Sequence, residues 1–267
     1  MITPVVQRWR DRRGSYRPAG EPIETRAYEV APIADDATAK AFVITHHYAR
    51  SYPAARYRFG LYRAETLVGV AVFSHPANNR TLDVFGGAPA VELGRLVLLD
   101  DVPANGESWF VARCFAALRS GGIAGVVSFA DPVPRTGESG MRVFPGHAGT
   151  VYQALNAQYS GRSRAETRRL LPDGTVLHNR ALAKLRARER GWEYVVESLV
   201  RQGAPAPSAD LDGWTDAVLA ALVRPLPHAG NHRYLFGLES VVRRRLARTQ
   251  PALVYPKLDP RALLVAA

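Results

Sequence analysis

Between residues 35 and 130, segments with a helical pattern alternate with segments with a strand pattern, and this order constrains the fold more than any other feature of the chain. A helix is predicted from Asp35 to Ile44, where Asp35 or Asp36 can accept the first free backbone N–H groups. Apolar side chains then alternate with arginine and glycine from Tyr57 to Leu61, and the run Leu67–Phe73 is wholly apolar or glycine. The two runs predict an antiparallel hairpin.

After the hairpin the pattern continues with a strand at Glu92–Leu99, a helix at Ser108–Arg119, a buried strand at Gly125–Ala130 and a short helix around Val151–Tyr159. The order helix, hairpin, strand, helix, strand, helix resembles that of the GNAT N-acetyltransferases more than a doubly wound sheet. We therefore expect an α/β fold with a GNAT-like mixed sheet flanked by helices.

Three regions are expected along the chain. Residues 1–29 are basic and interrupted by Pro and Gly, which predicts a loosely ordered arm. Residues 30–178 would form the GNAT-like domain, and residues 179–267 an α-rich, basic C-terminal extension that includes a helix from Asn179 to Arg190.

The formal net charge of +11 is unevenly distributed. Residues 1–17 have a net charge of +4 and residues 162–190 of +6, whereas residues 18–150 have −1. Basic blocks beside a neutral body are expected of a protein that holds a polyanion such as double-stranded DNA, although a solvated basic face is the alternative. The side chains expected to contact the DNA backbone are Arg162, Arg164, Arg168, Arg169, Arg180, Lys184, Arg186 and Arg188.

Composition excludes several classes of protein. Cys114 is the only cysteine, so neither an internal disulfide framework nor a zinc site with several thiolates can form. No apolar run is long enough to span a membrane, and the N-terminus lacks the apolar core of a signal peptide. We expect a cytoplasmic protein without a membrane partner.

The loop after Leu99 leads into the predicted central helix and is a candidate anion site. The amides near Asn105, Gly106 and Ser108 could bind a pyrophosphate at the start of that helix, where GNAT enzymes bind coenzyme A. The usual Arg/Gln-x-x-Gly-x-Gly/Ala signature of such a loop is absent, so a simple turn followed by a helix cap is the alternative.

Three further positions could carry chemistry. His47 and Tyr48 follow the first predicted helix, where an imidazole would be accessible. Asp131 follows an apolar strand, at the edge where α/β proteins place ligand-facing carboxylates. Tyr152 and Tyr159, seven residues apart on one predicted helix, would share a face, and core packing competes there with the stacking of a base.

With these segments in order, the chain resembles the Mom family, phage proteins that convert adenine in DNA to its N6-carbamoylmethyl form. A weaker similarity reaches His232-Arg233-Tyr234-Leu235, where the family tends to have Lys before the His and this chain has Asn231. The segments that carry the resemblance are His46-His47-Tyr48-Ala49-Arg50, the strand around Gly69, Glu92-Leu93-Gly94-Arg95-Leu96, Ser128-Phe129-Ala130-Asp131, Gly149-Thr150-Val151-Tyr152-Gln153-Ala154 and Tyr159-Ser160-Gly161.

The resemblance implies an active site made of His47, Tyr48, Arg95, Asp131 and Tyr152, with Ser108 near the cofactor. It also connects the chain with acetyl-CoA and with iron, and with a phage-encoded role in protecting DNA from restriction inside a bacterial host. The methyl carbon of an acetyl thioester is not electrophilic, so a metal-assisted step or a glycine-like donor would be needed, and the donor stays open.

The implied chemistry suggests a role for each residue. Asp131 would accept the N6 hydrogens of an adenine flipped onto Tyr48 or Tyr152. Arg95 would neutralise a carboxylate, phosphate or oxyanion, and His47 would move a proton or bind a metal. Two alternatives remain: an acyl-CoA-dependent N-acetyltransferase acting on a small amine or protein, and a non-catalytic DNA-binding protein.

Overall fold

The computed structural model describes residues 5–10, 13–49 and 51–257. Arg50, in the first segment of the resemblance, lies outside the described residues, as do 258–267 of the predicted C-terminal region. The chain divides into two compact units. Unit 1 comprises residues 1–132, 147–163 and 231–267, and unit 2 comprises 133–146 and 164–230.

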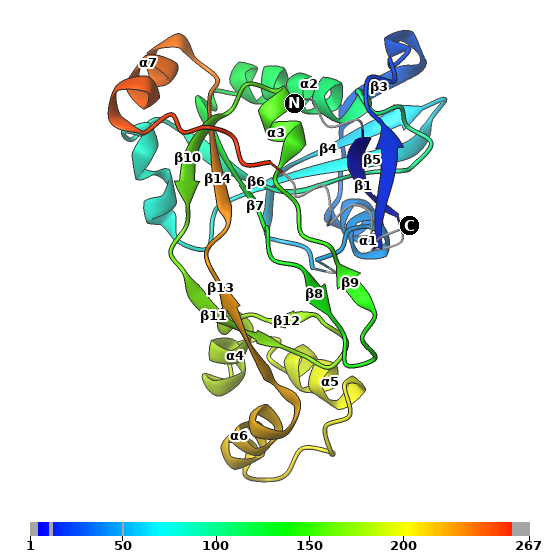
Figure 1. The fold of residues 1–267 in the computed structure, drawn as a ribbon, viewed down its shortest axis with the longest axis vertical. Coiled ribbons are helices and arrows are strands. Elements are labelled where there is room, and N and C mark those ends of the chain that lie inside the picture. Colours follow the sequence, from blue (N-terminus) through cyan, green and yellow to red (C-terminus); the bar gives the residue numbers. More distant parts are fainter. Residues whose placement is uncertain (1–4, 11–12, 50, 258–267) are drawn as a thin grey trace. The chain divides into compact units, whose positions relative to one another are not determined.

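Unit 1 is built on a seven-stranded sheet with the order β10-β14-β7-β6-β5-β4-β3 (Figure 1). Every neighbouring pair is antiparallel except β6 and β7, which are parallel and joined through a helix. The mixed sheet confirms the predicted fold class. Its strands are β3 (Tyr28–Pro32), β4 (Ala55–Arg63), β5 (Thr66–Ser74), β6 (Ala90–Leu98), β7 (Gly125–Ala130), β10 (Gln158–Arg162) and β14 (His232–Gly237).

Adjacent residues of the central strands point to opposite faces of this sheet, and each face has its own core. On one face Val126 and Phe236 pack in a cluster with Phe110, Cys114 and Leu118 of helix α2. On the other face Val127 and Leu235 pack with Phe85, Val242 and Leu246. The helices of unit 1 are α1 (Asp36–His46), α2 (Gly106–Ser120), α3 (Thr150–Ala154) and α7 (Ser240–Thr249), with 3-10 turns η1 (Thr25–Ala27) and η2 (Asn79–Phe85).

The parallel pair separates at one end. β6 and β7 pair only from Ala90 with Gly125 to Leu93 with Ser128, and the Ser128 hydroxyl donates to the Leu93 carbonyl at 2.9 Å. Beyond this point β6 continues against β5, and β7 continues against β14. The side chains that follow Leu93 and Ser128 therefore border the opening between the two strands.

Within the region predicted as a loosely ordered arm, residues 5–10 and 13–18 form two strands. β1 (Val5–Arg10) and β2 (Arg13–Pro18) form an antiparallel hairpin, and the Arg8 side chain is completely buried. A buried guanidinium needs polar partners in the folded protein. Nη2 of Arg8 donates to two carbonyls of the loop before α2, whereas Nε and Nη1 have no hydrogen-bond partner among the described residues.

Unit 2 is assembled from two segments that are distant in the sequence. The predicted boundary between residues 178 and 179 falls inside it, because β11 pairs with β12 on one side and with β13 on the other. The region after 179 is rich in helix but also supplies β13 and β14. The elements of unit 2 are β8 (Arg135–Thr136), β9 (Arg142–Phe144), β11 (Glu166–Leu170), β12 (Val176–Leu177), β13 (Arg224–His228), α4 (Asn179–Arg186), α5 (Glu193–Arg201) and α6 (Leu211–Leu222).

None of the helices in the described residues combines the length and the apolar character that crossing a membrane requires.

Candidate functional site

His47 and Tyr48 lie where helix α1 ends. The Asp35 side chain accepts the Thr38 N–H at 2.8 Å and starts the helix, and the His47 N–H closes it on the Val43 carbonyl, also at 2.8 Å. The two rings then stack, with centroids 4.2 Å apart and planes inclined by 29°. His47 is buried and Tyr48 is half-buried, so the tyrosine forms the more accessible side of the stack.

His47 is held as a neutral imidazole. Burial lowers its pKa well below the ordinary value, and the charges of Arg95 and His147 lower it further. Its Nδ1 accepts the Ala49 N–H at 3.1 Å, so the neutral ring carries its proton on Nε2. His47 is thus arranged to donate a hydrogen bond from Nε2 at neutral pH.

Arg95 reaches the same site from β6. Its guanidinium donates to the Ser51 carbonyl at 2.8 Å, the Ser51 hydroxyl at 2.7 Å and the Gly94 carbonyl at 2.6 Å. Three hydrogen bonds fix the plane of the fork, and other N–H groups remain for an anion. Burial lowers the pKa of Arg95, but an arginine stays charged at neutral pH.

Glu92 is a site residue that the sequence interpretation missed. β6 bulges at Gly94, because Arg95 pairs with Val72 while Leu93 pairs with Phe73, and this bulge interrupts the strand alternation between positions 92 and 95. The Glu92 carboxyl lies close enough to Arg95 to interact with it electrostatically. Burial raises its pKa, and Arg95 opposes that rise. The sequence feature that could have identified Glu92 is that it is the only acidic residue in an otherwise mostly apolar strand.

Asp131 ends the neighbouring strand and is buried, at 7% exposure. Its carbonyl accepts the His147 N–H at 2.8 Å, and His147 Nε2 lies 3.3 Å from the Tyr48 hydroxyl. The structure thereby connects β7 with the His47–Tyr48 stack through His147. The sequence interpretation did not select this histidine, which lies in a loop directly after Pro145 and Gly146.

Tyr152 belongs to the core more than to the surface of the site. It is 7% exposed and packs against Tyr234 and Phe236, with centroid distances of 5.3 and 6.3 Å. Gly149 permits this packing: its φ is +71°, and a Cβ there would come within 2.7 Å of Tyr152. Burial raises the pKa of the Tyr152 hydroxyl, and Arg95 lies within electrostatic reach of it.

The prediction that Tyr152 and Tyr159 share one helix was wrong. α3 ends at Ala154, Asn156 takes a positive φ of 56°, and Tyr159 lies in β10. There its hydroxyl lies 2.8 Å from Nδ1 of His232, which pairs across β14 and β7 with Ala130. Burial lowers the pKa of His232 to about 4, so this histidine too is neutral beside the end of β7.

The residues predicted to bind coenzyme A are engaged within the chain. The Asn105 N–H donates to the Glu21 carbonyl at 3.2 Å, the Gly106 N–H to the Pro103 carbonyl at 2.8 Å, and the Ser108 hydroxyl to the Asn105 carbonyl at 3.1 Å. The Arg8 guanidinium lies against the same loop. The backbone N–H groups of Asn105 and Gly106 and the hydroxyl of Ser108 are therefore occupied within the chain.

The predicted DNA-binding residues fall into two groups. Arg168, Arg180, Arg186 and Arg188 form ion pairs with carboxylates of their own unit, and Arg169 bonds to Asn179. Among the described residues, no ion pair is formed by Arg162, Arg164 or Lys184, although Lys184 acts electrostatically on Glu189 and lies over the Tyr194 ring. Arg162 also pairs with His232 in the strand register of unit 1.

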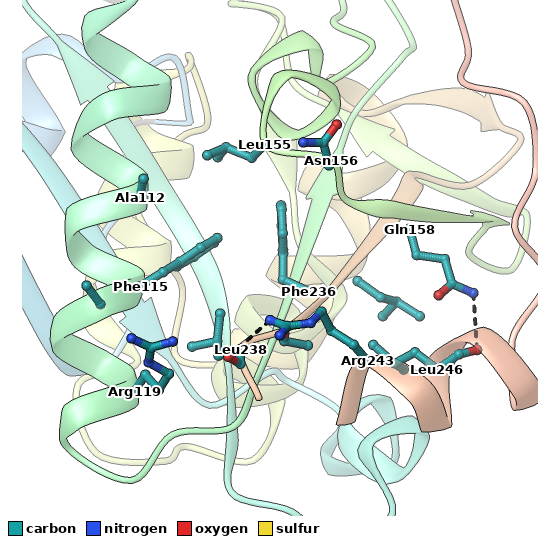
Figure 2. Close-up of a pocket in the computed structure, with 13 residues that line it drawn as sticks. Ala112, Phe115, Arg119, Leu155, Asn156, Gln158, Phe236, Leu238, Arg243 and Leu246 are labelled. Carbon is teal, nitrogen blue, oxygen red and sulfur yellow. Dashed lines mark hydrogen bonds between the residues drawn. The ribbon is translucent and has the colours of Figure 1, made fainter. Parts of the chain in front are cut away.

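A cavity of about 590 Å³ lies elsewhere in unit 1, between the second half of α2, the end of β14 and α7 (Figure 2). None of the predicted site residues lines it. Its walls include Phe115, Arg119, Phe236 and Arg243, and the Arg243 guanidinium donates to the Gly237 and Leu238 carbonyls. The cavity is therefore separate from the site formed by His47, Tyr48 and Arg95.

The iron implied by the resemblance finds no support in the donor groups. In the ranges that the structure describes, no three His, Cys, Asp or Glu side chains are grouped so that they could hold a metal ion.

The model of the Mom protein family matches residues 27–257. No curated protein sequence matches the chain. Similar solved structures include a tandem GNAT protein of clavulanic acid biosynthesis, solved without AcCoA, at 14% identity and a TM-score of 0.36, covering 66% of this chain and 64% of that one. Thus the chain spans less than two thirds of that protein.

Two further structures are an N-acetyltransferase from Staphylococcus aureus Mu50 and a Bacillus subtilis acetyltransferase in complex with CoA. The first has 9% identity and a TM-score of 0.36, covering 79% of this chain and 99% of that one. The second has 10% identity and a TM-score of 0.33, covering 79% and 98%.

Proposed function

The chain belongs to the Mom family, and from that membership we propose that it is a transferase that modifies adenine in double-stranded DNA. The modification is the addition of a carbamoylmethyl group to N6, which would protect phage DNA from restriction in the bacterial cytoplasm. The observation that carries the proposal is the convergence of the His47–Tyr48 stack and the fixed Arg95 guanidinium.

The target adenine has to leave the duplex, because its N6 is hydrogen-bonded inside the helix. Extrusion costs a few kcal/mol, and an aromatic surface compensates part of that cost. Tyr48 suits this role better than Tyr152, because Tyr48 is half-buried whereas Tyr152 is packed inside the core. We assign Tyr48 as the platform and Tyr152 as a core residue beside the site.

The reaction forms a bond between N6 and a methylene carbon while the bond from that carbon to the donor's leaving group breaks, and N6 gives up one proton. N6 is a weak nucleophile because its lone pair is delocalised into the ring. A carboxylate that accepts an N6 hydrogen strengthens it. Asp131 is our first choice for that acceptor, and Glu92, whose carboxyl has no hydrogen-bond partner among the described residues, is the second.

The donor group would meet Arg95 and His47. The remaining N–H groups of Arg95 suit a carboxylate or a developing oxyanion, and Nε2 of the neutral His47 can donate a further hydrogen bond. Because the Asn105 and Gly106 N–H groups are occupied within the chain, we assign no step to coenzyme A.

DNA is held, in our proposal, by basic side chains that are not already neutralised. Arg162 and Arg164 meet this condition, whereas Arg180 and Arg186 have carboxylate partners. Each phosphate contact contributes about −0.9 to the slope of log affinity against log salt. Arg162→Ala should therefore lower the slope by about 1, and Arg180→Ala by less. Equal effects of the two changes would argue against this assignment.

Mass spectrometry of nucleosides from DNA of cells expressing the chain tests the proposed reaction. We expect an adenosine derivative heavier by one carbamoylmethyl substituent, absent in cells that express Asp131→Asn. Full modification by Asp131→Asn would remove Asp131 from the mechanism. Unmodified DNA in every sample would favour the non-catalytic alternative, and acetyl transfer from acetyl-CoA to an amine without DNA would favour the N-acetyltransferase.

A further inference from the structure

The start of helix α2 is the place in this fold where an anion would be expected to bind. The first amides of a helix point outward without intrahelical partners, and the helix dipole adds a partial positive charge. α2 begins at Gly106, directly after the loop that follows β6. The N-terminal hairpin and the residues that follow it contact that loop.

Arg8 is the first element of this contact. Its side chain is fully buried, and its guanidinium donates to the Pro103 carbonyl at 2.8 Å and to the Ala104 carbonyl at 3.4 Å. The same group lies 3.4 Å from the Glu107 carboxylate, which is itself 13% exposed. Burial raises the pKa of Glu107, and Arg8 opposes that rise.

Glu21, which follows the hairpin, is the second element. Its carboxylate accepts the Ala104 N–H at 3.1 Å, and its carbonyl accepts the Asn105 N–H at 3.2 Å. Arg17 fixes that carboxylate with two hydrogen bonds, of 2.7 and 2.8 Å. The side chain and the backbone carbonyl of Glu21 thus occupy two N–H groups directly before helix α2.

The charged groups of this loop are already paired with one another. Arg8 lies against Glu107, Arg17 against Glu21 and Arg63 against Asp101. A diphosphate would therefore have to displace the Glu21 carboxylate, which carries charge of its own sign, from the Ala104 N–H.

We propose that the N-terminal hairpin, through Arg8 and Glu21, takes the place of a bound diphosphate at the start of α2, so that the chain's group donor is a molecule held without a nucleotide diphosphate there. The inference deepens the proposed function by restricting the donor class. It concerns binding alone, so it can fail while the DNA modification stands, and the reverse is also true.

Isothermal titration of the full chain with CoA and with acetyl-CoA, in the absence of DNA, tests the proposal. We expect no heat of binding at ligand concentrations up to about 1 mM. A dissociation constant of about 1 mM corresponds to a binding free energy of only about −4 kcal/mol. Inorganic pyrophosphate serves as the second probe. Glu21→Ala, which frees the Ala104 amide, should permit weak pyrophosphate binding that the unchanged chain lacks.

Two serine variants locate any binding that is observed. Ser108→Glu adds a negative charge in the first turn of α2, and the control Ser120→Glu adds the same charge at its other end. CoA affinity in the micromolar range that falls at least tenfold in Ser108→Glu alone would overturn the proposal. CoA binding that both variants leave unchanged lies elsewhere and supports it. Faster tryptic cleavage of the hairpin on adding CoA would also overturn it, because the hairpin would then be a displaceable cover.

Discussion

The ring of Tyr48 lies on the ring of His47 at 4.2 Å, while its hydroxyl reaches to 3.3 Å from Nε2 of His147. One side chain therefore joins the end of α1 to the loop after β7. Its ring and its hydroxyl can be separated by mutation, because phenylalanine keeps the first contact and loses the second.

If the ring of Tyr48 supports the flipped adenine, Tyr48→Phe should retain most of the modification and Tyr48→Ala should lose it. Base stacking on an aromatic side chain contributes about 1–3 kcal/mol, which corresponds to about 5- to 150-fold in affinity. The yield of modified nucleoside measures the effect, with Tyr57→Ala as a control on β4. Similar losses in the Phe and Ala variants would assign the role to the hydroxyl instead.

Arg95→Lys should reduce the modification about 100-fold or more, although the charge is kept. Lysine cannot reproduce a planar fork that donates to Ser51 and Gly94 and still faces a ligand. Thermal unfolding of the same variant separates loss of activity from loss of fold. Retention of more than about half of the activity would show that only the charge matters.

The neutral state of His47 predicts how stability depends on pH. The folded pKa lies below the ordinary value of about 6.5, so the unfolded chain takes up this proton first as the pH falls. The stability linked to His47 is therefore complete above about pH 6.5 and is lost progressively below it. Urea unfolding at pH 7.5 and pH 5 should show a smaller difference for His47→Gln than for the unchanged chain.

His46→Gln is the matched control for that measurement, and it should keep the pH dependence of the unchanged chain. Part of the pH dependence should remain in His47→Gln. The pKa of His232 is about 4, so the protein also loses the stability linked to this histidine over the same acid range. An unchanged difference in His47→Gln would contradict the assignment of a buried neutral imidazole.

Local signals in the sequence were sufficient for the central strands of the sheet. The predicted strand at Gly125–Ala130 matches β7, and the N-cap at Asp35 is present, because short-range patterning determines both. The segments with His47, Tyr48, Arg95 and Asp131 do come together around the end of the parallel pair.

The features that escaped prediction depend on contacts between distant residues. Nothing near Arg8 indicates that its charge is buried, since its partners lie 95 or more residues further along the chain. Unit 2 could not be found by looking for a single domain boundary along the sequence, because two separate segments combine to form it. The helix at α3 was predicted too long. The spacing of seven residues between Tyr152 and Tyr159 fits one continuous helix, but it fits a short helix followed by a strand equally well.

The last prediction concerns the ion pair that anchors the hairpin. Arg8→Met leaves the Glu107 carboxylate without its buried partner, and breaking such a pair costs about 3–5 kcal/mol of unfolding free energy. Arg8→Met combined with Glu107→Gln removes both charges, so its cost should be clearly less than the sum of the two single changes. The free energies come from urea unfolding of the four proteins.

Arg63→Met is the matched control, because the Arg63–Asp101 pair joins the same loop to β4 but is exposed to solvent. Exposed pairs contribute about 0–1 kcal/mol, so this change should have little effect. If Arg8→Met costs no more than Arg63→Met, the hairpin is not held by its buried charge, and the loop before α2 is open to ligands. If the predicted difference is found, the start of α2 is closed by the chain itself, and the donor has to be sought among molecules that bind beside Arg95.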